Sequence, residues 1–254
     1  MPISAKVFQR WLQGIAPDTS TSDICRVSGI KRTTLAQQLV RGKVAESTVV
    51  SISRAYNVNP LSALAAFDAY SSLAEPAPQP TRSELVSQIA TPDLLRALLA
   101  RSVGAPAGTP SGAPALEVPG TDAPALEPPP HATSVKNWVE AIDDGELRHR
   151  VSEATGIAPQ NYSAQLTANR LAPELAVATS LAAGVRPANG LVATGLVTEA
   201  EAGWAPGARQ DALASLSDGE LTTLAGERLQ ALGRALRRHE HDQEQTEKIW
   251  ENLG

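Results

Sequence analysis

Apolar residues recur at helical spacing along the first seventy residues of the chain, and no stretch there alternates as a strand does. The first stripe has the i, i+3, i+4, i+7 spacing of one buried helical face and consists of Phe8, Trp11, Leu12 and Ile15. Shorter stripes follow, separated by residues typical of helix starts and ends. The pattern predicts five short helices: one over 8–15, one from Ser20 to about Ser28, one from about Arg32 to Gly42, one from about Glu46 to Asn57, and one opening at Pro60 and carrying Leu61, Leu64 and Phe67.

The chain also matches itself at a constant offset of 127 residues. From Trp11 paired with Trp138 to Pro60 paired with Pro187 the alignment needs no gap, and 12 of its 50 positions are identical. Where the copies differ, Gly and Asn exchange with each other: Gly42 with Asn169, and Asn57 with Gly184. Both residue types tolerate the left-handed backbone that ends a helix, so the turns are predicted to be the same in both copies.

The offset continues more weakly beyond the first copy. It pairs two further apolar stretches, through Ile89 with Leu216, Leu94 with Leu221, and Arg101 with Arg228. We therefore expect a duplicated unit that consists of a small helical domain, a Pro-containing tether and a short amphipathic helix. The predicted organisation is a first domain over 1–74, a tether and helix over 75–103, a linker over 104–133, a second domain over 134–202 and a helical segment over 203–254.

The linker between the copies has a biased composition. Residues 104–133 hold eight Pro and four Gly, and Ala-Pro-Ala-Leu-Glu begins at Ala113 and again at Ala123. Such a segment cannot bury a core, and it spans at most ~90 Å at about 3.1 Å per residue. The sequence therefore predicts two domains on a flexible tether, which would tolerate varied spacing between their binding sites.

The order of short helix, Gly turn, short helix and two more helices is typical of a helix-turn-helix domain. The sequence resembles the Cro/phage-repressor-like superfamily over about 8–67 and again over 135–194. The residues that carry the resemblance are Ile24, Cys25, Gly29, Ile30, Leu35, Arg41, Gly42 and the stretch from Ser51 to Pro60. Gly29 and Gly42 lie 13 positions apart, one more than in the commonest members, so recognition-helix positions can shift by one. The second copy also resembles repressors of actinobacterial phages and their hosts.

The resemblance implies an all-α fold with two tandem helix-turn-helix domains, in which the helix after Gly29 enters the DNA major groove. An α-helix fits that roughly 12 Å wide groove, and the residues of its first turn meet the base edges. Residues suited to bases and phosphates gather there and beside it. The predicted DNA-binding residues of the first copy are Lys31, Arg32, Thr33, Thr34, Gln37, Gln38, Arg41, Lys43 and Arg26.

The second copy has lost the positive charge at the matching positions. Lys31 and Arg32 correspond to Ala158 and Pro159, while hydrogen-bonding residues remain nearby. The candidate DNA-binding residues there are Gln160, Asn161, Gln165 and Arg170, with Arg148, His149 and Arg150 close to a DNA backbone. Two alternatives stay open: a second, weaker DNA-binding domain, or a degenerate copy used for protein contact.

The net charge of −5 counts against a nucleic-acid binder only if it is spread evenly. Residues 1–70 hold eight Lys and Arg against four Asp and Glu, a net charge of +4, whereas residues 71–133, 134–200 and 201–254 carry −3, −2 and −4. Charge asymmetry of this kind points to a partner rather than to a fold. The first copy is therefore the expected DNA-binding part.

Several classes of function find no support. The single Cys cannot form an intramolecular disulfide, and the chain has no phosphate loop, nucleophile elbow, metal-ligand cluster or membrane-length apolar run. We expect no enzyme, no cofactor and no metal, and a cytoplasmic, nucleoid-associated protein. A leucine stripe over 217–236 predicts a helix that either mediates self-association or packs on its own domain: Leu221, Leu224, Leu229, Leu232 and Leu236.

The sequence thus predicts a sequence-specific transcriptional regulator, in particular a repressor, that binds double-stranded DNA in the major groove. The alternative is a protein-interaction adaptor or antirepressor that keeps the helix-turn-helix fold without strong DNA binding. Phosphate contacts make DNA affinity depend steeply on salt, so a salt titration separates the two hypotheses.

Overall fold

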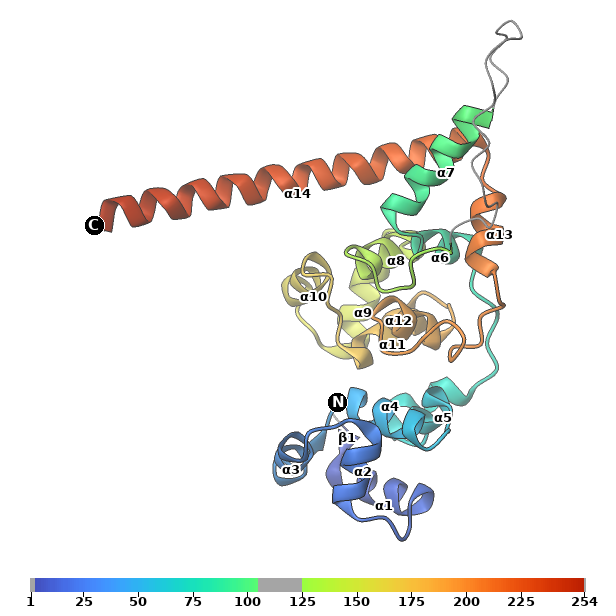
Figure 1. The fold of residues 1–254 in the computed structure, drawn as a ribbon, viewed down its shortest axis with the longest axis vertical. Helices are drawn as coiled ribbons and strands as arrows, with labels where there is room; N and C mark the ends of the chain where they lie inside the picture. Colours follow the sequence, from blue (N-terminus) through green and yellow to red (C-terminus); the bar gives the residue numbers. More distant parts are fainter. Residues whose placement is uncertain (1–2, 105–124, 254) are drawn as a thin grey trace, which may run out of the picture. The chain divides into compact units, whose positions relative to one another are not determined.

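The computed structural model describes the backbone of residues 3–104 and 125–253, and side chains over 3–102, 125–238 and 240–243. Within these ranges the chain forms fifteen helices and one pair of two-residue strands, which confirms the all-α prediction at the level of fold class (Figure 1). No helix in the described ranges combines the length and apolar character needed to cross a lipid bilayer.

The first repeat, residues 3–75, has the five helices expected from the hydrophobic pattern. The sequence did not predict two strands, β1 (Ile3–Ser4) and β2 (Lys43–Val44), which pair antiparallel. Two residues are too few to show a period of two. The fifth helix is also shorter than expected, because Phe67 lies beyond it. The helices are α1 (Ala5–Ile15), α2 (Thr21–Ser28), α3 (Arg32–Val40), α4 (Glu46–Ala55), α5 (Pro60–Ala65) and the 3-10 helix η1 (Asp68–Ala74).

Short polar side chains start these helices. The Ser20 hydroxyl accepts a hydrogen bond from the Asp23 N–H, which confirms the predicted N-cap of α2. The Asn59 side chain accepts hydrogen bonds from the N–H groups of Leu61 and Ser62, and Pro60 stands at the first helical position. Local chemistry alone therefore places two of the five helix starts.

The second repeat, residues 130–202, reproduces the first. The predicted exchange of Gly and Asn is confirmed: φ is 71° at Gly42 and 50° at Asn169, and 55° at Asn57 and 69° at Gly184. Asn169 has an added role, because its Oδ1 accepts a hydrogen bond from the Val135 N–H at 2.9 Å. The helices are α8 (Ser134–Ile142), α9 (Leu147–Thr155), α10 (Pro159–Thr167), α11 (Pro173–Ala182) and α12 (Pro187–Ala193).

The segment after the first repeat packs on the second. Helix α6 (Arg82–Ser87) begins at Thr81 and buries Glu84, whose side chain is 1% exposed. The Glu84 carboxylate accepts hydrogen bonds from Trp138 Nε1 at 3.2 Å and Asn189 Nδ2 at 2.9 Å. Asn189 Oδ1 in turn accepts one from Trp204 Nε1 at 2.9 Å. Buried polar groups need such partners, so this chain of hydrogen bonds ties 82–88 to the second repeat.

The chain divides into two compact units, and the predicted domain boundaries differ from this division. One unit comprises 1–88 and 128–208 and so contains both repeats; the other comprises 89–127 and 209–254. The expected tether and helix over 75–103 is therefore shared between units. Most of the predicted linker, 105–124, lies outside the described residues. Both repeats lie in the first of these units; the flexible tether stays a prediction.

The second unit is built around helices α7 (Thr91–Gly104), α13 (Ala208–Ala214) and α14 (Asp218–Leu253). The weak extension of the repeat is visible here, since Leu94 and its counterpart Leu221 are both fully buried. Arg101 donates hydrogen bonds to the carbonyl oxygens of Leu216 at 2.6 Å and Leu213 at 3.0 Å. Helices that correspond in the two copies therefore pack against each other.

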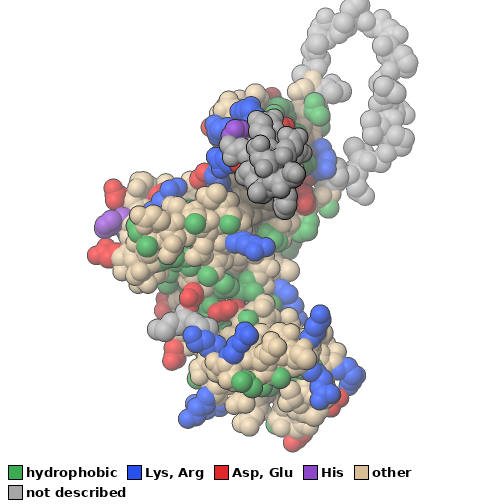
Figure 2. All heavy atoms as spheres, turned by 90° about the vertical axis from the view of Figure 1, so that its left-hand side faces the viewer, with side chains coloured by type: hydrophobic (Ala, Val, Ile, Leu, Met, Phe, Trp, Pro, Cys, Tyr) green, Lys and Arg blue, Asp and Glu red, His purple; other side chains and the backbone are tan. Residues whose placement is uncertain are grey.

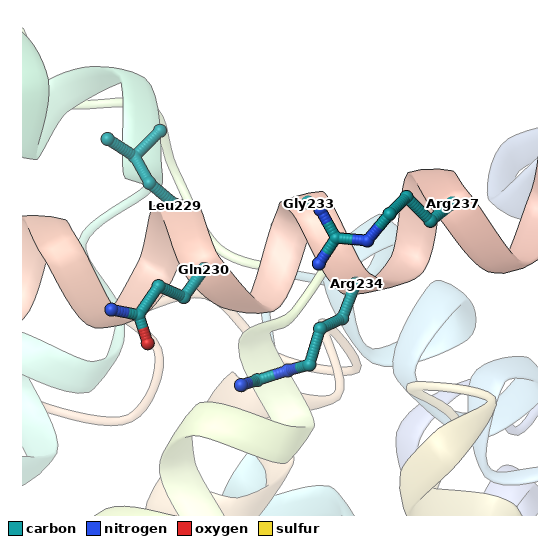
Figure 3. Close-up of a pocket in the computed structure, with 5 residues that line it drawn as sticks. All are labelled: Leu229, Gln230, Gly233, Arg234 and Arg237. Carbon is teal, nitrogen blue, oxygen red and sulfur yellow. The ribbon is translucent and has the colours of Figure 1, made fainter.

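Helix α14 extends well past the predicted stripe. Leu221 is buried on α7, whereas Leu229, Leu232 and Leu236 are 46%, 48% and 52% exposed. A depression of about 500 Å³ lies beside it, and its lining residues all come from α14, as Figure 3 shows: Leu229, Gln230, Gly233, Arg234 and Arg237. A surface formed by one helix does not enclose a ligand, so we assign none.

We predict that the buried carboxylate of α6 contributes strongly to stability. In Glu84→Ala the N–H groups of Trp138 and Asn189 lose a charged acceptor, which costs about 2–3 kcal/mol. Urea denaturation followed by tryptophan fluorescence measures the loss. The matched control is Ser83→Ala, an exposed neighbour on α6 that should change stability by less than about 0.5 kcal/mol. Equal losses would show that Glu84 does not hold the segment.

Candidate nucleic-acid interface

Helices α2 and α3 meet at a tight turn that fixes the direction of α3. Gly29 ends α2 with φ of 72°, a left-handed conformation that favours glycine, and Lys31 precedes the first residue of α3. Ile24 on α2 and Leu35 on α3 are 2% and 0% exposed and anchor both helices in the core. The opposite face of α3 is therefore turned to solvent.

That face carries most of the predicted DNA-binding side chains. The structure places them together on the outer side of α3, in the turn before it and in the segment after it. The exposed members are Lys31, Arg32, Thr33, Thr34, Gln37, Arg41 and Lys43. The same face also carries Val40, which the sequence pattern did not single out and which is 88% exposed at the last turn of α3. Its exposed methyl groups would suit contact with a thymine methyl group.

The charges on this face lack carboxylate partners. Among the described residues, Lys31, Arg32, Arg41 and Lys43 form no ion pair. Arg26 differs, because it pairs with Asp23 at 3.3 Å. The Ser20 hydroxyl and then the Arg26 guanidinium lower the pKa of Asp23 below its ordinary value. Figure 2 shows Lys and Arg side chains spread over the first repeat on the side that bears α3. Four cations there are available to an anionic partner.

Gln38 and Gln165 have another role in the structure. Gln38 Oε1 accepts hydrogen bonds from the Ala45 N–H at 3.2 Å and the Thr48 hydroxyl at 2.9 Å. Its counterpart Gln165 accepts one from the Ala172 N–H at 3.1 Å. Both glutamines hold the start of the next helix, which gives a physical reason for their identity in the two repeats. We therefore treat them as positioning residues rather than as base-contacting ones.

The corresponding face of the second repeat is less charged. Pro159 opens α10 at its first position, as expected, and Gln160, Asn161 and Arg170 are exposed. The cations of the preceding helix are engaged within the protein. Arg150 pairs with Asp144 at 2.9 Å, and Arg148 lies 3.9 Å from Asp143. The Arg150 guanidinium also lowers the pKa of Asp144. Little free positive charge remains beside α10.

One ion pair joins the two repeats. Arg54 on α4 donates two hydrogen bonds to the Glu201 carboxylate, at 2.6 and 2.7 Å, and one to the Leu196 carbonyl oxygen at 3.2 Å. Asn59 Nδ2 donates to the Glu201 carbonyl oxygen at 3.2 Å. A bidentate Arg–carboxylate pair fixes orientation as well as distance. Helices α3 and α10 lie on the same side of this unit in Figure 1.

The comparisons with known proteins identify no relative. No protein-family model matches the chain, and neither a curated protein nor a solved structure does. The resemblance to phage repressors therefore stays an expectation drawn from the residues. The described residues also contain no group of three or more His, Cys, Asp and Glu side chains that would hold a metal ion.

We predict that the ion pair between the repeats makes stability depend on pH. Its hydrogen bonds from Arg54 lower the pKa of Glu201 below 4.5, so the pair stabilises the fold above that pH and stops doing so as the pH falls through the lowered value. At pH 7, Glu201→Gln should cost up to about 1 kcal/mol, since the pair is partly exposed. Urea denaturation of both proteins between pH 7 and pH 3.5 should show the difference shrinking.

The matched control is Glu153→Gln on α9, whose side chain is exposed. It should change stability little at any pH in this range. A difference between the parent protein and Glu201→Gln that stays constant down to pH 3.5 would contradict the assignment.

Proposed function

We propose that the protein is a sequence-specific DNA-binding transcriptional regulator of the repressor type, with two tandem helix-turn-helix domains. The observation that carries the proposal is the set of four exposed, carboxylate-free cations on and beside α3: Lys31, Arg32, Arg41 and Lys43. Phosphate contacts supply most of the affinity of proteins for DNA, so such a face has the charge that a DNA backbone requires. The left-handed turn at Gly29 and the buried Leu35 support the assignment, because they aim the face outward.

The side chains of this face divide by chemistry. Arg32, in the first turn of α3, suits a bidentate contact with guanine, and Gln37 suits adenine. Thr33 and Thr34 suit a phosphate or a thymine methyl group. Arg41 and Lys43 follow the helix and suit phosphates, which position a protein on the duplex without specifying sequence. The first repeat thus combines base recognition with backbone binding.

The second repeat has a lesser part in the proposal. Gln160 and Asn161 occupy the first turn of α10 and retain hydrogen-bonding groups, while Arg170 supplies one cation. The ion pair between Arg54 and Glu201 joins the two repeats. When the first repeat binds DNA, the face of α10 would then lie at a set spacing along the same duplex. Two unequal faces at a fixed spacing would recognise an asymmetric site.

A second candidate is a protein-interaction adaptor or antirepressor. It is favoured by the engagement of Arg148 and Arg150 with Asp143 and Asp144, which leaves the second repeat with little free positive charge. The unpaired cations around α3 favour DNA binding by the first repeat. Self-association through the exposed leucines of α14, residues 229–236, is compatible with either candidate and stays a prediction.

We predict unequal losses of DNA binding from the two repeats. Arg32→Ala removes a base contact and a cation from the first repeat and should abolish most specific binding, whereas Gln160→Ala should weaken it less. Fragments recovered by pull-down from genomic DNA serve as the probe in a gel-shift titration. Arg234→Ala, an exposed arginine on α14, is the control and should bind as the parent does. Equal losses from the two variants would contradict unequal repeats.

We also predict a steep salt dependence. About five phosphate contacts give a slope of log affinity against log salt near −4 to −5, and Lys43→Ala should reduce its magnitude by about 1. Fluorescence anisotropy with a labelled duplex measures both slopes. Absence of measurable binding to any genomic fragment at about 50 mM salt would support the adaptor instead.

A further inference from the structure

The two repeats differ in how one equivalent face is covered. In the second repeat, α6 covers the outer face of α8 and α12, and we call this face and its counterpart on α1 and α5 the docking face. Ser134 on α8 is 0% exposed, whereas its counterpart Val7 on α1 is 39% exposed. Asn189 on α12 is buried, whereas its counterpart Ser62 on α5 is exposed. The docking face of the first repeat is therefore open within its unit.

The repeat also supplies a second copy of the covering helix. At the offset of 127 residues, α6 corresponds to α13, and Glu84 corresponds to Asp211. Helix α13 buries Arg209 and Ala212 in its own unit. Three residues in or just after α6 are buried against the second repeat, and their counterparts in or just after α13 are exposed. The pairs, with the buried residue given first, are Glu84 and Asp211, Ser87 and Ala214, and Gln88 and Ser215.

We propose that α13 of one copy of the chain docks on the first repeat of another copy, as α6 docks on the second repeat within the chain. In this contact the Asp211 carboxylate accepts a hydrogen bond from Trp11 Nε1, the role that Glu84 has toward Trp138. Two different surfaces meet, so the contact is heterologous and links copies head to tail. It needs no DNA and is separate from the proposed DNA-binding face.

Side-chain sizes differ in a compensating way. A Cβ at Gly190 would lie 2.8 Å from Trp138 Cη2 and 2.6 Å from the Ala176 carbonyl oxygen, so glycine lets this tryptophan pack deeply. The counterpart of Gly190 is Ala63, and there Trp11 is only partly buried. A tryptophan nearer the surface suits a shorter acid, and Asp211 is one methylene shorter than Glu84.

Charge favours a copy of this chain as the occupant. Lys6 and Arg10 are exposed on α1 and form no ion pair among the described residues. Residues 1–70 carry a net charge of +4 and residues 201–254 one of −4. On α13 itself Arg209 is buried and Asp211 is exposed, so the carboxylate is the charge that α13 offers to Lys6 and Arg10.

Another copy is the occupant because both surfaces are exposed within one chain, Val7 and Ser62 on the docking face and Asp211 on α13. Helix α13 also follows closely on its own second repeat. Trp204 is hydrogen-bonded to Asn189 of that repeat. Only the three residues 205–207 separate Trp204 from α13, a connection of at most ~14 Å.

Cross-linking of single-cysteine chains tests the contact. In a Cys25→Ser background, one chain carries Val7→Cys and a differently tagged chain carries Ser215→Cys. These positions match Ser134 and Gln88, whose side chains are hydrogen-bonded. A short bismaleimide should link the mixed chains at least five-fold more than either chain alone. Ser102→Cys on α7 replaces Ser215→Cys in the control, which should give only the background yield.

Charge variants then test the partner surface. Asp211→Lys should lower the mixed cross-link at least five-fold, and Arg10→Glu in the other chain should restore part of it. Self-linking of Val7→Cys chains would overturn the head-to-tail contact, as would the absence of mixed product at about 100 µM protein. A chain that carries both cysteines gives a further test. If it cross-links only within itself, with a yield that does not change on dilution, then α13 docks within its own chain and not on a second copy. No DNA is present, so these outcomes leave the proposed function to be judged separately.

Discussion

The buried carboxylate of Glu84 is the interaction that holds α6 on the second repeat. An ionisable group at 1% exposure is costly unless donors surround it, and Trp138 and Asn189 both donate to it. Asn189 also accepts from Trp204, which follows the second repeat. This series of hydrogen bonds therefore connects α6, which precedes the second repeat, to α8 and α12 of that repeat and to Trp204, which follows it.

Holding α6 on the second repeat changes what the two repeats can do together. The first repeat ends only a few residues before α6, and Arg54 and Asn59 join it to the loop around Glu201. Both candidate DNA-binding faces belong to this one unit. If the second repeat binds DNA as proposed, its weakly charged face would do so as part of the same unit as the first repeat.

Local signals in the sequence predicted much of the fold. Capping at Ser20, the left-handed positions at Gly29 and Asn169, and the starts of α2 and α5 follow from short-range chemistry. The outward face of α3 followed from the same pattern. Other features depend on distant partners. Glu84 and Asn189 are 105 residues apart, and Arg54 and Glu201 are 147 residues apart. A hydrophobic pattern reports only on neighbours along the chain, so it does not predict these two contacts. The positioning role of Gln38 was not predicted, because its partners lie at the start of the next helix.

The most direct test of the account is the spacing of the two halves of a recovered DNA site. Insertion of about five base pairs between the halves turns one half to the opposite side of the duplex. Affinity measured by anisotropy should then fall to that of the first half alone, because a single unit holds α3 and α10 on one side. Unchanged affinity across insertions of about five and ten base pairs would contradict a fixed pair of repeats. It would favour two domains joined by a flexible tether.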